Sequence, residues 1–262
     1  MIRNKHHMTD NITIESAGIN LSAVIDFPDG FDKKNKTPIC IIIHGITGNK
    51  EEPHLLAVRD AALRAGCVTL RADMYGHGES GGFFCDHTLN LWLDNILSVL
   101  EYVRDLDYVS DIYLCGHSQG GCAVMLAAAA YGERFEIAGL IPLSPACHIP
   151  DNSRRGEILG IEFDPMHIPD ELPLWDDFVI KSDYLMVAQT INMEESIDKY
   201  TGPVLIVHGS ADESVPIKYG RDAANRYKNS TFVEITGDTH CFDYHADEMA
   251  AVVEKWLKND DM

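Results

Sequence analysis

The sequence LCGHSQGG at residues 114–121 places Ser118 between two glycines with the spacing G-x-S-x-G. An apolar run at residues 111–115 precedes it, and small residues at 122–130 follow it. This order predicts a strand, a sharp turn and a helix. In such a turn the serine adopts strained backbone angles, and glycines that lack a Cβ let strand and helix approach closely. Because so short a motif also arises by chance, the surrounding elements decide its meaning.

Strand and helix patterns alternate along the chain. Apolar, β-branched runs predict buried strands, and apolar spacing of three and four residues predicts helices. The strands are expected at residues 38–43, 67–72, 111–115, 137–143, 203–207 and 231–235, and the helices at 55–65, 89–103, 218–227 and 246–257. The first thirty residues alternate as an antiparallel pair does. The pattern favours an α/β fold with a mostly parallel central sheet flanked by helices.

One segment interrupts this rhythm. Residues 146–200 contain four prolines and no comparable strand run. We interpret this segment as a small inserted cap after the sixth strand, over the active site, and residues 1–145 and 201–262 as the core. Ligands bind outside the carboxyl ends of the strands in open α/β sheets, so the cap is expected to cover that edge.

An acid and a base follow later strands at the same edge. Asp212 comes after the strand at residues 203–207, and His240 after the strand at 231–235. The order serine, acid, histidine is that of a nucleophile elbow with its triad. We therefore predict Ser118, His240 and Asp212 as catalytic residues. Glu213 and Asp238 remain rival acids.

Two backbone N–H groups are expected to form an oxyanion hole, those of Gln119 and of Ile46 in the loop after the third strand. The other histidines near the site favour structural roles. His44 is expected to fix the oxyanion loop and His117 to pack beside the serine. His208 is expected to be buried and hydrogen-bonded, and His245 is a weaker rival to His240.

Composition limits the function classes. The formal net charge is −20 and the pI near 4.8, which disfavours nucleic acid as a partner. No apolar run predicts a membrane span, and the N-terminus resembles no secretory signal. Seven scattered cysteines without C-x-x-C favour reduced thiols, a cytoplasmic location and no metal site. The predicted chemistry needs no cofactor, and a homodimer is compatible with the sequence.

The motifs HGITGNK, DMYGHGES, GHSQGG, HGSAD and GDTHCF together resemble the α/β-hydrolases and cover nearly the whole chain. HGITGNKEE (44–52), HIPDELP (167–173) and THCF make the chain similar to the bacterial cinnamoyl (feruloyl) esterases. That resemblance implies a cap that holds the aromatic acid, with Asp151 and Tyr184 as binders of the phenol. Trp175 in the same segment is expected to line an aromatic pocket, or to hold the cap onto the body.

These observations lead to one hypothesis and several alternatives. The hypothesis is a serine carboxylesterase that forms an acyl-enzyme. Its small-molecule substrates would be aromatic esters of ferulate, caffeate or coumarate, or chlorogenate-type esters. The alternatives are an acyl-peptidase or thioesterase with the same triad, a carbon–carbon bond hydrolase, and a non-catalytic binding module on a hydrolase fold. A dehalogenase is disfavoured because Ser118 stands where that chemistry needs a carboxylate.

Overall fold

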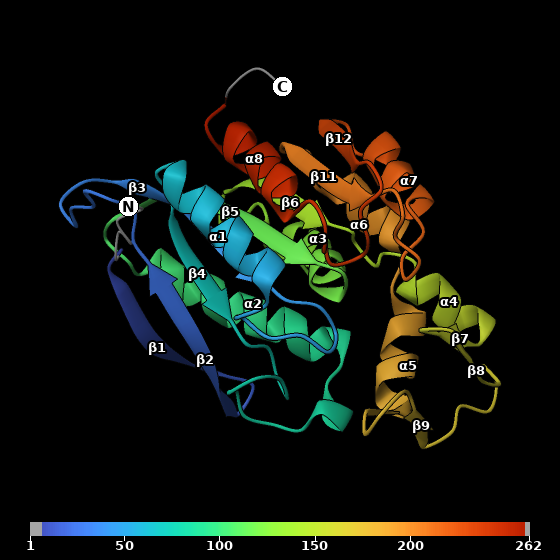
Figure 1. The fold of residues 1–262 in the computed structure, drawn as a ribbon. Coiled ribbons are helices and arrows are strands. Elements are labelled where there is room, and N and C mark those ends of the chain that lie inside the picture. The colour runs from blue at the N-terminus through green and yellow to red at the C-terminus, as the bar shows by residue number, and fades with distance from the viewer. Residues whose placement is uncertain (1–6, 260–262) are drawn as a thin grey trace.

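A computed structural model describes residues 7–259, which form an eight-stranded sheet in the order β1-β2-β4-β3-β5-β6-β11-β12 (Figure 1). Strands β1 and β2 pair antiparallel, β2 is antiparallel to β4, and the remaining pairs are parallel. The strands are β1 (Thr9–Ser16), β2 (Ile19–Asp26), β3 (Thr37–Ile43), β4 (Val68–Ala72), β5 (Val109–His117), β6 (Ile137–Leu143), β11 (Val204–Gly209) and β12 (Ser230–Ile235). The predicted fold class is confirmed.

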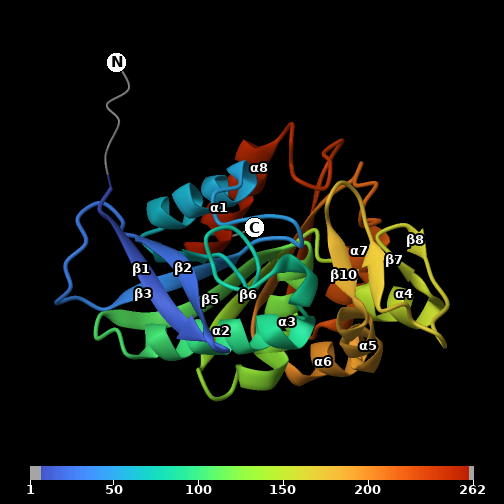
Figure 2. The same ribbon diagram turned by 90° about the horizontal axis from the view of Figure 1, so that it is seen from below.

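Helices cover both faces of this sheet. Helices α1 and α8 lie side by side on one face, and α2 and α3 lie on the other, as Figure 2 shows. The helices of the main body are α1 (Pro53–Arg64), α2 (Leu89–Arg104), α3 (Gln119–Tyr131), α7 (Lys218–Arg226) and α8 (Ala246–Leu257), and η1 (Phe84–Asp86) is a short 3₁₀ turn. Thr88 caps α2 by accepting a hydrogen bond from the N–H of Leu91 at 3.1 Å.

The run PICIII explains why β3 lies at the centre. Residues 39–43 are all fully buried, and their side chains alternate between the two faces. Ile39, Ile41 and Ile43 pack into the core under α2 and α3, whereas Cys40 and Ile42 pack under α1 and α8. A strand buried on both faces needs apolar residues at every position, and this run supplies them.

The segment between β6 and β11 stays outside the main sheet. It contains α4 (Ile149–Arg155), the hairpin β7 (Glu157–Ile158) and β8 (Ile161–Glu162), the hairpin β9 (Glu171–Pro173) and β10 (Val179–Lys181), α5 (Ser182–Thr190) and α6 (Met193–Lys199). The two hairpins, α4 and α5 share an apolar cluster with Ile46, Leu89 and Val215 of the main body. By contrast, Met193 and Ile197 of α6 belong to the main core. The segment forms one side of the molecule in Figure 1.

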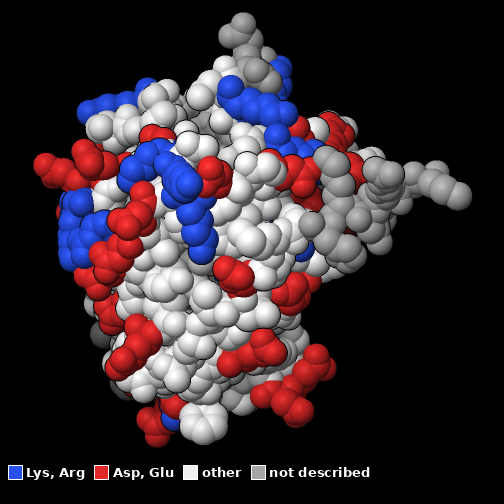
Figure 3. All heavy atoms as spheres, turned by 90° about the vertical axis from the view of Figure 1, so that its left-hand side faces the viewer, with Lys and Arg blue, Asp and Glu red and all other residues white. Residues whose placement is uncertain are grey.

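The surface carries the excess of acid. On the face shown in Figure 3, acidic side chains are widely scattered, and lysines and arginines lie among them in its upper half. No helix within residues 7–259 is long and apolar enough to cross a membrane.

Candidate active site

Ser118 stands at the sharp turn between β5 and α3. Its backbone angles, φ 55° and ψ −119°, lie in a region that residues other than glycine rarely adopt. Glycines make this turn possible: a Cβ at Gly116 would lie 2.3 Å from the carbonyl oxygen of Gly120. A Cβ at Gly120 would lie 2.3 Å from the carbonyl oxygen of His44. The G-x-S-x-G spacing is therefore required by contacts between backbones.

His240 and Asp212 meet at the carboxyl ends of β12 and β11. The His240 Nδ1 lies 2.7 Å from the Asp212 Oδ2. This contact leaves Nε2 as the nitrogen that can serve as a base. Ser118 and His240 line the same cavity. The structure thus brings together the three residues that the sequence predicts as a triad.

Asp212 is held as a carboxylate. Burial by itself would raise its pKa, but hydrogen bonds from His208 and His240 outweigh burial and hold the pKa below its ordinary value. The Oδ1 atom also accepts the backbone N–H groups of Ser214 at 2.9 Å and Val215 at 2.8 Å. Both carboxylate oxygens therefore have two partners each, Oδ1 in the backbone and Oδ2 in the two histidines, and these contacts fix the orientation of the carboxylate.

The loop after β3 is called the oxyanion loop here because the sequence predicts an oxyanion donor at Ile46. Two buried histidines fix this loop. His44 Nε2 accepts the backbone N–H of Met74 at 2.9 Å, so its Nδ1–H donates to the Gly45 carbonyl at 2.7 Å. His77 Nε2 contacts the carbonyl oxygen of Ile46. Burial lowers the pKa of His44 to about 3, so its imidazole stays neutral. The loop that carries the Ile46 N–H is thereby anchored at two carbonyls, as expected for His44.

A buried ion pair holds the far end of this loop. Lys50 Nζ lies 2.7 Å from the Asp73 Oδ2, and the Lys50 backbone N–H donates to the other oxygen of Asp73 at 2.7 Å. Asp73 also accepts the N–H of Glu79 at 2.9 Å. The motif DMYGHGES therefore stabilises the oxyanion loop and takes no part in the chemistry.

A cavity of about 200 Å³ opens beside Ser118. Its core side includes Ile46, Gln119 and His240, and its cap side includes Leu159 and Trp175. Gln119 is the first residue of α3, so its backbone N–H lacks a partner within the helix. A second, more polar cavity of about 410 Å³ adjoins the first, and both are lined by His148, Leu159, Trp175 and Ser214.

Comparisons with known proteins identify the family. The family model described as "Serine aminopeptidase, S33" matches residues 34–164, half of the chain. The structure of Est1E from Butyrivibrio proteoclasticus with bound ferulic acid is 51% identical, with a TM-score of 0.92, and the match covers 95% of this chain and 98% of that one. This chain is an α/β-hydrolase. Within that family it is a carboxylic ester hydrolase.

More distant relatives share the hydrolase fold. The mitochondrial palmitoyl-protein thioesterase ABHD10 of Mus musculus is 26% identical over 74% of this chain, and protein ABHD12B of Homo sapiens is 24% identical over 77%. The hydrolase spans 65% and 54% of the lengths of these two relatives.

The cap residues expected to bind a phenol lie outside the cavity lining. The Asp151 side chain is 60% exposed and pairs with Arg154. Tyr184 is fully buried, and its hydroxyl donates to the Gln119 Oε1 at 2.7 Å. In this conformation of the hydrolase neither side chain faces the space beside Ser118. Trp175 does line that space, as expected, and is 40% exposed.

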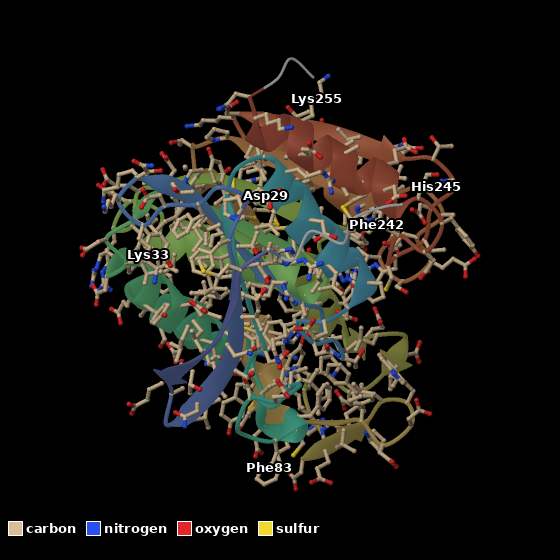
Figure 4. The ribbon with its side chains drawn as sticks, turned by 60° about the vertical axis from the view of Figure 1, so that its left-hand side comes forward. Asp29, Lys33, Phe83, Phe242, His245 and Lys255 are labelled. Carbon is tan, nitrogen blue, oxygen red and sulfur yellow. The ribbon has the colours of Figure 1, made fainter. Side chains whose placement is uncertain are left out.

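The rival acids and bases have other contacts. Asp238 accepts the backbone N–H groups of Thr239, Tyr244 and His245 and so shapes the loop that carries His240. Glu213 lines the second cavity. His245 is exposed at the start of α8, whereas Phe242 of the same loop is buried; Figure 4 labels both. The hydrolase therefore presents Asp212 alone to His240.

Two residues at the site escaped the sequence reasoning. His208 was expected to be buried, but its second contact is the acid itself: its Nε2 lies 3.1 Å from the Asp212 Oδ2 and 2.8 Å from the Val215 carbonyl oxygen. The signal is its place at the end of β11, four residues before the acid. Glu52 lines the catalytic cavity at the start of α1. Its charged neighbours in sequence, Lys50 and Glu51, are typical of an exposed segment and gave no sign of this position.

Proposed function

We propose that this hydrolase cleaves esters of hydroxycinnamic acids, with Ser118, His240 and Asp212 as its triad. The observation that carries the proposal is the 51% identity, over nearly the whole of both chains, to an esterase whose structure holds ferulic acid. An apolar cavity next to the serine supports it further.

The geometry supports a two-step acyl transfer. The Ser118 Oγ attacks the ester carbonyl while His240 Nε2 takes its proton, and Asp212 holds the Nδ1–H tautomer and stabilises the imidazolium. The backbone N–H groups of Ile46 and Gln119 bind the oxyanion. His240 then protonates the leaving alcohol. Water, activated by the same histidine, cleaves the acyl-enzyme and releases the acid and Ser118.

The acyl group is expected to occupy the cavity between the core and the cap. Ile46, Ala146, Ile149 and Val215 give it apolar walls, and Trp175 adds an aromatic face. A cavity of about 200 Å³ suits one aromatic acid better than a long fatty acyl chain. This observation favours a feruloyl esterase over a palmitoyl thioesterase with the same triad.

Hydrolysis of a small ester panel tests the proposal. Methyl ferulate, chlorogenate, p-nitrophenyl acetate and an acyl-CoA are offered to the wild type and to Ser118→Ala. We expect a strong preference for the two cinnamates and a loss of roughly 10⁴-fold or more in kcat in the variant, with a nearly unchanged Tm. Activity on the acetate alone would reject the cinnamate assignment, and retained turnover in Ser118→Ala would reject the triad.

A further inference from the structure

Glu52 brings a carboxyl group to the oxyanion loop. It precedes α1, lines the catalytic cavity and has a side chain that is 25% exposed. A Cβ added to Gly48 would lie 2.2 Å from the Glu52 Oε2, so the carboxyl occupies the space that the glycine leaves open. The backbone of Asn49 forms a hydrogen bond with the carboxyl group. Yet Oε2 is buried and has no hydrogen-bond partner within the described residues.

Two more unpartnered atoms continue from Glu52 toward the catalytic histidine. His54 Nε2 is buried, lacks a partner in the described chain, and lies 3.9 Å from the Glu52 Oε2. The His54 ring packs edge to face on His117 with centroids 4.2 Å apart. His117 Nδ1 is the third buried atom without a partner, while its Nε2 donates to the carbonyl oxygen of His240 at 2.8 Å.

One proton satisfies the first two of these atoms. When His54 carries its proton on Nδ1, its Nε2 and a Glu52 carboxylate are both acceptors and cannot pair, whereas a carboxylic acid O–H of Glu52 can donate to Nε2. The two atoms lie 3.9 Å apart, and the proposed pairing brings them within hydrogen-bond distance. Burial raises the pKa of Glu52 to about 7, against the opposing hydrogen bond at Asn49. Burial lowers the pKa of His54 to about 4, and the nearby His240 lowers it further.

The groups around Glu52 supply no compensating charge. His54 faces it from α1, and Cys241 faces it from the loop after β12. Burial raises the pKa of the Cys241 thiol to about 11, and the charge of Glu52 contributes to that shift, so the thiol is neutral. Asp243, the remaining charged neighbour of this group, interacts with His54 and Cys241 and is itself acidic.

Two buried cations of the neighbouring segments pair with other acids. Lys50 pairs with Asp73 and Glu79, and Arg71 pairs with Asp26 and Glu51. Within residues 7–259, no lysine or arginine forms an ion pair with Glu52. An ionised Glu52 would therefore be a partly buried negative charge without a counterion, in the cavity where the oxyanion develops.

We propose that Glu52 is a positioning residue for ester hydrolysis: as a neutral acid it holds the oxyanion loop and pairs with His54, and as a carboxylate it opposes the negative charge of the tetrahedral intermediate. The inference rests on the proposed role of Ser118 as nucleophile. It concerns the reaction at the ester carbonyl and does not depend on which acid the cap accepts.

The pH dependence of kcat for p-nitrophenyl acetate between pH 5 and 9 tests this role. We expect kcat of the wild type to fall on the alkaline side of this range, as Glu52 ionises. Glu52→Gln keeps the neutral form and the shape of the side chain. It should remove the alkaline limb, so that the ratio of kcat at pH 9 to kcat at pH 7 rises roughly tenfold.

Glu51→Gln is the matched control. Glu51 is 52% exposed, pairs with Arg71 and does not line the cavity, so this variant should keep the alkaline limb. An alkaline limb that is the same in the wild type and in Glu52→Gln would overturn the proposal, as would a wild type without such a limb.

Thermal unfolding supplies a readout that is independent of turnover. The folded pKa of Glu52, about 7, lies above its ordinary value of 4.5, so between these values the folded state binds more protons than the unfolded state. Stability therefore falls as pH rises through this window. The difference between the Tm of Glu52→Gln and that of the wild type should grow in favour of the variant from pH 4.5 to 7. Above pH 7 this difference should stay constant. A difference in Tm between Glu52→Gln and the wild type that does not change with pH would contradict a neutral Glu52. This result does not depend on whether Ser118 is the nucleophile, which Ser118→Ala tests separately.

Discussion

The two walls of the catalytic cavity are built by different means. On the core side, Ser118 and His240 sit in turns at strand ends, and backbone hydrogen bonds from the main sheet fix their neighbours. On the cap side, Leu159 and Trp175 lie in the turns of two short hairpins and line the cavity. Ser118 is 8% exposed and Trp175 40%. The comparison teaches that the predicted triad lies on the buried wall at the strand ends, whereas the more exposed wall is the one through which substrate preference is proposed to act.

The largest effect should come from the core wall. Asp212→Asn keeps acceptors for the N–H groups of Ser214 and Val215 but no longer enforces the His240 tautomer. We expect kcat to fall about 10⁴-fold, equally for methyl ferulate and p-nitrophenyl acetate. Glu213→Gln, at the neighbouring acid, is the control and should retain most activity. A loss confined to one of the two esters would break the proposed division between the walls.

A smaller and selective effect is expected from the cap wall. Trp175→Ala removes the aromatic face that borders both cavities. The KM for methyl ferulate should rise about tenfold, whereas kcat/KM for p-nitrophenyl acetate should change less than about twofold, because acetate does not reach the cap. Steady-state kinetics on both esters measure the difference. Equal losses on both would show that Trp175 supports the core wall instead.

The smallest effect sharpens the boundary between the walls. Tyr184→Phe removes a buried hydroxyl that donates to Gln119, and it leaves the Oε1 of Gln119 without its donor. We expect a loss of stability of about 1–3 kcal/mol and a decrease of about twofold to fivefold in turnover that is similar for ferulate and acetate esters. Denaturant unfolding and kinetics measure the two quantities. A decrease seen with ferulate alone would return Tyr184 to the phenol site that the family resemblance implies.

The sequence predicted the core wall because local rules place its residues. Apolar runs located β3, β5, β11 and β12, and parallel strands bring their carboxyl ends to one edge, which places Ser118, Asp212 and His240 together. The glycines at 116 and 120 marked the turn. Periodicity and order along the chain were sufficient here because each residue lies within a few positions of a strand end.

The cap escaped the same rules for physical reasons. Its strands are two or three residues long, too short to show a period. Local matching placed Asp151 and Tyr184 at the pocket, but helix α4 turns Asp151 outward to Arg154 and α5 turns Tyr184 inward to Gln119. The contact of Glu52 with the oxyanion loop was equally invisible, because it depends on the missing Cβ of Gly48.

The close approach of Gly120 to the His44 carbonyl has a consequence for how this chain can change. The two oxyanion donors, on Ile46 and Gln119, each lie within two residues of that contact. The width of the proposed oxyanion hole is thus set where two main chains touch, and side-chain exchange at Ile46 or Gln119 leaves its backbone donors in place. Substitutions in the cap can therefore change which ester fits the cavity while the proposed oxyanion hole keeps its dimensions.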